Sequence, residues 1–223
     1  MPRTDEIRAN IAALESRIAA ACARAGRDRS EVTLVAVTKT FPAADVDHAI
    51  AAGMTNLGEN KVQEARDKKP LVGGAARWHL IGHLQSNKAK DAVRLFDVIQ
   101  TVDSIELAER IARLAETEGK RQEVMLQVNV GGEEQKSGAE PSEVASLAAR
   151  VRELASLELI GFMTIPPAGE AEAMRPYFRQ LRSMRHDLGV QHLSMGMTDD
   201  FEVAIEEGST VIRVGRAIFG SRG

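Results

Sequence analysis

Lys39 is the residue of this sequence with the clearest potential for chemistry. It follows the run 32–37, which is almost entirely apolar and rich in β-branched residues, and it therefore ends a predicted buried strand. An ammonium group at the edge of an apolar core is partly desolvated, which lowers its pKa and leaves the amine nucleophilic. Such an amine can form a Schiff base with an aldehyde. From spacing alone, a structural lysine paired with a carboxylate such as Glu59 is an equally good interpretation.

Two glycine-containing segments near the C-terminus have the pattern of a phosphate site. The segment 194–198 (Ser-Met-Gly-Met-Thr) and the segment 215–220 (Gly-Arg-Ala-Ile-Phe-Gly) each follow a short apolar run and precede a helical pattern. Glycines let backbone N–H groups approach phosphate oxygens, and the start of a helix favours an anion. Gly196 or Gly215 alone is better explained by a tight turn, but together the two segments favour phosphate binding.

Arg213 lies on the last predicted strand, just before the second of these segments. If its side chain points into the core, it needs a polar partner, because a guanidinium group does not give up its proton. A ring nitrogen or a carboxylate would serve as that partner. An arginine that faces solvent on the outside of the fold is the alternative.

The histidines do not have the pattern of a metal site. His79 and His83 are four residues apart, but no Cys, Asp or Glu completes a ligand set, so we expect no bound metal. His83 and Lys136 are candidates for the rim of a site, since each lies in a segment that follows a strand. Met163 is a further rim candidate, although packing in the core explains it better.

The segments that must position these residues alternate between strand and helix patterns. An amphipathic helix is predicted over 4–26, and eight strand patterns follow, each succeeded by a helical pattern. The predicted strands are 32–37, 55–58, 78–82, 96–102, 124–130, 157–163, 192–195 and 210–214. This alternation predicts an α/β fold, a (β/α)8 TIM barrel over 32–223. Residues 1–223 would form a single domain, with the N-terminal helix covering the bottom or side of the barrel.

Composition excludes several classes of protein. The net charge is −3 and aromatic residues make up only 4%, which argues against a nucleic-acid-binding surface. The one cysteine, Cys22, cannot form an internal disulfide, which fits a cytoplasmic protein. Neither a signal peptide nor a stretch long enough to cross a membrane is visible.

At the predicted strand ends the sequence resembles the pyridoxal phosphate homeostasis protein family, single-domain relatives of the N-terminal barrel of alanine racemase. The blocks that carry the resemblance run from the first predicted strand to the C-terminus and are highly specific as a set. They are 34–40 (Leu-Val-Ala-Val-Thr-Lys-Thr), 57–64 (Leu-Gly-Glu-Asn-Lys-Val-Gln-Glu), 78–88 (Trp-His-Leu-Ile-Gly-His-Leu-Gln-Ser-Asn-Lys), 136–138 (Lys-Ser-Gly), 161–165 (Gly-Phe-Met-Thr-Ile), 193–200 (Leu-Ser-Met-Gly-Met-Thr-Asp-Asp) and 211–220 (Val-Ile-Arg-Val-Gly-Arg-Ala-Ile-Phe-Gly).

The resemblance implies pyridoxal 5′-phosphate (PLP) as the cofactor, held as a Schiff base on Lys39. It places Asn60 beside the ring and Arg213 at the pyridine nitrogen. The residues implied around the phosphate are Ser194, Thr198, Gly215 and Arg216, the last two through their backbone N–H groups. Thr198 replaces a frequent serine and keeps the hydroxyl group. Arg216 replaces a frequent threonine, which removes a hydroxyl and adds a positive charge, and Lys61 replaces an apolar or aromatic residue.

The resemblance also implies a PLP-binding protein of vitamin B6 homeostasis, and it assigns no catalytic residue. An arginine at the pyridine nitrogen keeps that nitrogen unprotonated, which makes the ring a weaker electron sink. The second acid–base group of the racemases is a tyrosine from another domain, and the only tyrosine here, Tyr177, falls on a predicted helix. A weak racemase that uses His83 or Lys136 is one alternative, and a lyase that forms a Schiff base with a phosphorylated sugar is another. PLP-dependent apo-enzymes are possible partners, and a monomer is expected.

Overall fold

The structure is a computed structural model that describes residues 2–133 and 135–220. Within these residues all eight strands pair in parallel in the order of the sequence and close on themselves, since β1 pairs with β8 as well as with β2. The strands are β1 Thr33–Val37, β2 Asn56–Glu59, β3 Arg77–Leu80, β4 Val98–Val102, β5 Gln122–Gln127, β6 Leu157–Met163, β7 His192–Ser194 and β8 Val211–Val214. The predicted (β/α)8 barrel is therefore confirmed.

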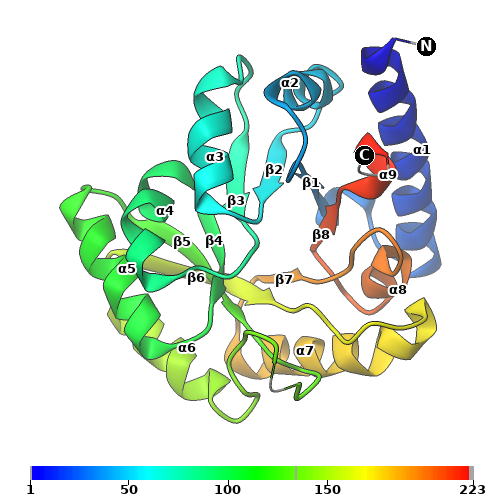
Figure 1. Ribbon diagram of the computed structural model, residues 1–223. Helices are drawn as coiled ribbons and strands as arrows, with labels where there is room; N and C mark the ends of the chain where they lie inside the picture. The colour runs from blue at the N-terminus through cyan, green and yellow to red at the C-terminus, as the bar shows by residue number, and fades with distance from the viewer. Residues whose placement is uncertain (1, 134, 221–223) are drawn as a thin grey trace.

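The helices lie outside the ring of strands (Figure 1). They are α1 Arg3–Arg24, α2 Ala43–Ala51, α3 Val62–Lys68, α4 Ala89–Leu95, α5 Ile105–Thr117, α6 Val144–Glu153, α7 Arg175–Leu188, α8 Phe201–Glu206 and α9 Arg216–Phe219. Side chains and glycines set several of their ends. The hydroxyl group of Ser104 accepts a hydrogen bond from the backbone N–H of Leu107 at 3.3 Å and caps α5, and Gly189 ends α7 in the left-handed region.

Alternate residues of the strands divide the core into two layers. Val35 of β1 and Val211 of β8 pack inside the barrel with Met125 and Met163. Their neighbours along the same strands, such as Leu34 and Ile212, belong to the larger cluster between the strands and the helices. Because side chains of a strand point alternately to its two faces, Arg213 lies on the same inner face as Val211.

The predicted N-terminal helix is confirmed as α1, and it covers the side of the barrel rather than its bottom. It packs against α2, α8 and α9 (Figure 1). The guanidinium group of Arg3 donates to the Asp45 carboxylate at 2.7 Å and to the Phe219 carbonyl oxygen at 2.8 Å, so it links the start of α1 to α2 and to α9.

The helix predicted over 170–188 is divided in the structure. A short 3-10 helix, Ala171–Met174, precedes α7, and Pro176 lies in the first turn of α7. Proline has no N–H group to donate and fits the first turn of a helix, so α7 begins there.

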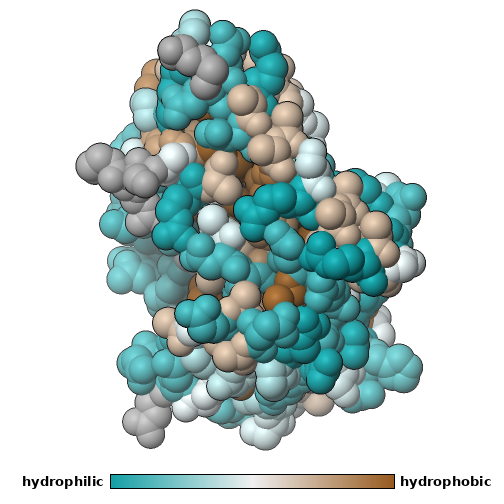
Figure 2. Space-filling view, turned by 90° about the vertical axis from the view of Figure 1, so that its right-hand side faces the viewer, coloured by the Kyte–Doolittle hydropathy of each residue, from teal (hydrophilic) through white to brown (hydrophobic). Residues whose placement is uncertain are grey.

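On the side of the molecule where α1 lies, the surface is mostly hydrophilic, with hydrophobic residues in small patches (Figure 2). None of the helices within residues 2–133 and 135–220 is long and apolar enough to cross a membrane.

Candidate functional site

A cavity of about 520 Å³ lies where the carboxyl ends of β1, β2 and β8 meet. It is lined by six of the seven residues that the sequence predicts for cofactor binding. They are Lys39, Asn60, Thr198, Arg213, Gly215 and Arg216. These residues are distant in the sequence, and the closed barrel brings them together because all parallel strands end on the same side.

Lys39 lies two residues after the end of β1, and it is half-buried at the cavity. The next residue, Thr40, has a φ of 69° and is the only non-glycine residue with a positive φ in the part of the chain that the structure describes. A β-branched residue rarely adopts this left-handed conformation, because its Cβ substituents crowd the backbone. The chain therefore turns away from β1 under local strain right beside Lys39.

We expect Thr40→Gly to raise the free energy of unfolding by about 1 kcal/mol, since relief of about 1–3 kcal/mol of strain exceeds the entropy cost of glycine. Thr40 is exposed, so few other contacts change. Urea unfolding measures the effect. Thr40→Ala is the matched control, because alanine keeps Cβ and with it the strain. Equal or lower stability of the glycine variant relative to the alanine variant would show that Thr40 is not strained.

Asn60 is placed by close backbone packing against Gly82. A Cβ atom at Gly82 would lie 2.2 Å from the Asn60 carbonyl oxygen, so only glycine permits this approach. The hydroxyl group of Thr101 donates to the Gly82 carbonyl oxygen at 2.9 Å and holds the loop from the other side. The Gly82 of the predicted third strand thus serves to bring Asn60 to the cavity.

Arg213 reaches the cavity from inside the barrel and is only 3% exposed. Its guanidinium group donates to the Ser194 hydroxyl at 2.7 Å and to the Thr164 carbonyl oxygen at 2.8 Å. Both partners are neutral. Burial lowers the pKa of Arg213 to about 10, which the Asp200 carboxylate partly opposes, so the group stays positive at neutral pH. A positive charge is therefore held at the inner wall of the cavity by hydrogen bonds that do not neutralise it.

A chain of hydrogen bonds runs from Arg213 across the interior of the barrel. The Ser194 hydroxyl donates to Oε1 of Gln100 at 2.6 Å, and Nε2 of Gln100 lies 3.0 Å from Nδ1 of His79. Nε2 of His79 lies 3.0 Å from Oδ1 of Asn56, at the start of β2. Desolvation lowers the pKa of His79 to about 3, so its ring is neutral. Every donor can then point the same way, from Arg213 towards Asn56.

The predicted phosphate segments form another part of the cavity wall. Thr198, Gly215 and Arg216 all line it, and the Arg216 guanidinium pairs with the carboxylate of Asp199, which also lines the cavity. A Cβ atom at Gly215 would lie 3.0 Å from the Val37 carbonyl oxygen and 3.2 Å from Val37 Cβ. The turn that follows β8 therefore packs tightly on the end of β1, two residues before Lys39.

The structure does not bring four predicted site residues to the cavity. Ser194 is fully buried, and its hydroxyl group lies between Arg213 and Gln100. Met163 is fully buried in the barrel interior. His83 is exposed, and its Nδ1 is 3.2 Å from the Ser137 hydroxyl. Lys136 donates to the Pro166 carbonyl oxygen at 3.0 Å. The contact of Ser194 with a phosphate group and the rim positions of the other three residues stay predictions. Within the described ranges, no group of three His, Cys, Asp or Glu side chains could hold a metal.

The residues that the sequence did not point to are mainly apolar. Val37, Phe41, Ile81, Ile165 and Met197 line the cavity. Their positions directly beside strand ends are the signal that could have found them, since in a barrel such positions surround the mouth. An apolar wall with a few polar groups is typical of a site for a small organic ligand.

Comparison with known proteins gives consistent matches over the whole barrel. The family described as "Alanine racemase, N-terminal domain" matches residues 5–223. The pyridoxal phosphate homeostasis protein of Pseudomonas aeruginosa is 44% identical over 217 residues, which cover 96% of this chain and 94% of that protein. The corresponding protein of Aquifex aeolicus is 42% identical over 214 residues, covering 92% of this chain and 94% of that protein. The structure of PipY from Synechococcus elongatus PCC7942, with PLP bound, superposes with a TM-score of 0.85 at 35% identity and covers 96% of this chain and 100% of PipY.

Identity at this level over almost the full length of the relatives shows the family, and the fold agrees with it. The range that the family matches begins inside α1 and continues beyond α9, so it includes all eight strands and most of the additional helix α1. This chain belongs to the pyridoxal phosphate homeostasis protein family, whose barrel is that of the alanine racemase N-terminal domain.

Proposed function

We propose that this protein binds PLP in the cavity at the mouth of the barrel, as a Schiff base on Lys39, and takes part in intracellular PLP homeostasis. The observation that carries the proposal is the meeting of Lys39, Arg213 and the turn at Gly215 around one cavity. The relative PipY, whose structure is described with PLP bound, supports the same ligand. The proposed reaction of Lys39 is condensation of its amine with the aldehyde group, which forms a C=N bond and releases the carbonyl oxygen as water.

The chemistry of the lining residues fits the parts of PLP. Apolar residues such as Ile81 and Val37 can pack on the ring, and Asn60 lies beside them. The Arg213 guanidinium can donate to a pyridine nitrogen, which must then be unprotonated, because two cations would repel each other. The Thr198 hydroxyl and the Arg216 guanidinium can bind a phosphate group. In the structure the Arg216 guanidinium pairs with the Asp199 carboxylate, and a phosphate group would take the place of that carboxylate.

The same arrangement supports a carrier or regulator rather than an enzyme. An unprotonated pyridine nitrogen makes bound PLP a weak electron sink, and racemisation needs an acid–base group on each face of the ring. His83 and Lys136 do not line the cavity, and Tyr177 packs against the core from α7. None of the three favours the racemase alternative. Incubation with single-enantiomer amino acids tests it, and steady loss of optical purity would support a racemase.

Spectroscopy of the purified protein tests the proposal. Addition of PLP should produce an absorbance band of a protein-bound Schiff base, and borohydride should remove the band by reducing the C=N bond. Mass analysis of peptides should then find the pyridoxyl group on Lys39. A protein that gives no band with PLP, or that carries the reduced group on another lysine, would refute the assignment. A lyase for phosphorylated sugars would give no such band with PLP.

Gly215→Leu should weaken binding of PLP about tenfold, because a side chain here must displace the turn from Val37 and disturbs the backbone that faces the phosphate. Binding of pyridoxine 5′-phosphate, which carries the phosphate but no aldehyde, should weaken equally. Equilibrium dialysis measures both. Gly73→Leu is the control, since its nearest neighbour, Oδ1 of Asp47, would lie 3.9 Å from Cβ. Unchanged retention in Gly215→Leu would mean that the phosphate lies elsewhere.

We further propose that the protein acts in the cytoplasm as a monomer and that PLP-dependent apo-enzymes are its possible partners. The single cysteine, Cys22, is buried, which fits a reducing compartment. Size-exclusion chromatography with light scattering tests the monomer. Transfer of PLP to a purified apo-enzyme, faster than release into buffer, would support a direct partner.

A further inference from the structure

We infer that Lys68 and Glu59 are positioning residues for Lys39, because they fix the backbone that carries its side chain. The inference rests on the proposed function, since it concerns the same amine. Lys68 is the last residue of α3, and Glu59 is the last residue of β2. Neither lines the cavity, so any effect they have on the ligand must pass through other residues.

The residue before Lys39 is held by both of them. Nζ of Lys68 donates to the Thr38 carbonyl oxygen at 2.7 Å. The Thr38 hydroxyl donates to Oε1 of Glu59 at 2.6 Å, and Nζ of Lys68 donates to the same Oε1 atom at 2.6 Å. Thr38 is therefore fixed through its backbone and through its side chain at once.

The residue after Lys39 is held by the same helix. The backbone N–H of Thr40 donates to the carboxylate of Glu64, which also accepts from Nζ of Lys68 at 3.1 Å. This contact secures Thr40 in the left-handed conformation that turns the chain out of β1. A single ammonium group, that of Lys68, thus connects the supports on the two sides of Lys39.

The burial of this cluster argues that it has a purpose beyond stability. The exposed fraction of the Glu59 side chain is 0% and that of Lys68 is 8%. Burial raises the pKa of Glu59, which its hydrogen bond with Lys68 opposes, and Oε2 of Glu59 is buried without a hydrogen-bond partner among the described residues. Well-packed apolar residues would often stabilise a fold as much as such a pair. They could not, however, supply the bonds to Thr38.

The decisive variant is Lys68→Met, which preserves most of the side-chain volume and removes all of its hydrogen bonds. We expect the affinity for PLP to fall about ten- to a hundredfold, because a small displacement of a reacting group costs about that much. The affinity for pyridoxine 5′-phosphate should stay unchanged, because this ligand has no aldehyde to react with Lys39. A purely structural role of Lys68 would instead lower both affinities in parallel.

Lys69→Met is the matched control, because the neighbouring Lys69 donates to the Leu95 carbonyl oxygen and not to the residues around Lys39. If Lys68→Met does not fold, the double variant Glu59→Gln with Lys68→Met removes the unpaired buried charge and is measured in the same way. Parallel losses for the two ligands, or an unchanged affinity for PLP, would overturn the inference. A wild-type protein that binds neither ligand would instead refute the proposed function itself.

Discussion

Lys39→Ala is expected to abolish the Schiff-base absorbance band and to lower the affinity for PLP by about a hundredfold or more. Lys39 is the lysine that lines the cavity, and a held amine reacts with a bound aldehyde at a very high effective concentration. Removal of the amine takes away this intramolecular reaction but leaves Arg213, Thr198 and Gly215 in place. The affinity for pyridoxine 5′-phosphate should therefore change little.

The comparison of the two ligands separates the covalent bond from the rest of the site. Absorbance spectra and equilibrium dialysis give the two measurements. Lys61→Ala is the control, because Lys61 follows Asn60 in the chain but is exposed and does not line the cavity. If Lys39→Ala keeps a band that borohydride removes, another lysine forms the Schiff base. If it loses both ligands equally, Lys39 contributes to folding or phosphate binding instead.

The barrel and its mouth could be predicted because both follow from short-range patterns. The apolar run 32–37 predicts a strand, and Lys39 lies at its end. Because all parallel strands of a barrel end on the same side, Arg213 and Gly215 are expected near Lys39. The prediction of one continuous helix over 170–188 did not take account of Pro176, which fits the first turn of a helix but not its interior. The residue at which that first turn begins depends on packing.

The depth of a side chain within the barrel could not be read from the sequence. Ser194 has the residue type of a phosphate ligand, but β7 places its hydroxyl inside the barrel, against Arg213. Its other partner, Gln100, is 94 residues away, and no local pattern connects the two. The same is true of Lys68. The sequence shows only that it is a charged residue on a predicted helix, whereas its burial results from the contact of α3 with the ends of β1 and β2.

His79 should make the free energy of unfolding strongly dependent on pH. Its pKa in the folded protein is about 3, below the ordinary value of 6.5, because the buried ring is desolvated and the positive charge of Arg77 acts in the same direction. Between these values the unfolded chain binds more protons than the folded chain does. The stabilisation is therefore complete above about pH 6.5 and is lost as the pH falls towards 3, with a slope of about 1.4 kcal/mol per pH unit and a total on the order of 5 kcal/mol.

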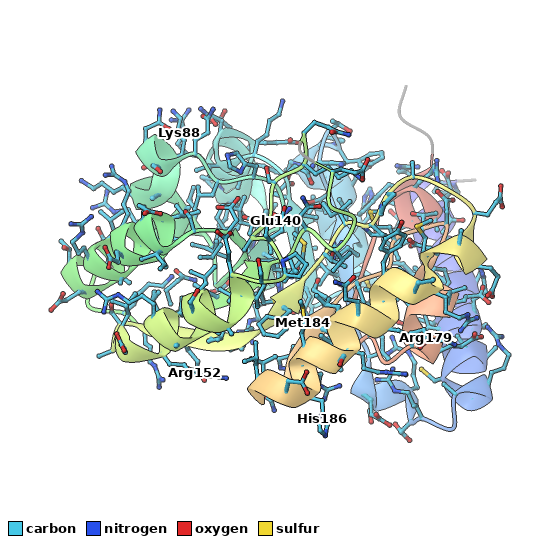
Figure 3. All side chains as sticks on the ribbon, turned by 90° about the horizontal axis from the view of Figure 1, so that it is seen from below. Lys88, Glu140, Arg152, Arg179, Met184 and His186 are labelled. Carbon is cyan, nitrogen blue, oxygen red and sulfur yellow. The ribbon has the colours of Figure 1, made fainter. Side chains whose placement is uncertain are left out.

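His79→Gln is the variant that isolates this effect, because the amide of glutamine can accept from one neighbour and donate to the other as the neutral ring does, but it cannot be protonated. We expect urea unfolding to give similar stabilities for the two proteins at pH 7 and a growing relative advantage for His79→Gln as the pH falls to 4. His186→Gln is the control, since His186 projects from the end of α7 with 92% of its side chain exposed (Figure 3). Wild-type and His79→Gln proteins that lose stability in parallel would show that His79 takes up a proton in the folded state. In that case Nδ1 of His79 would carry a hydrogen facing the Gln100 amide, and the hydrogen-bond chain that ends on Arg213 could not hold the guanidinium in the way described.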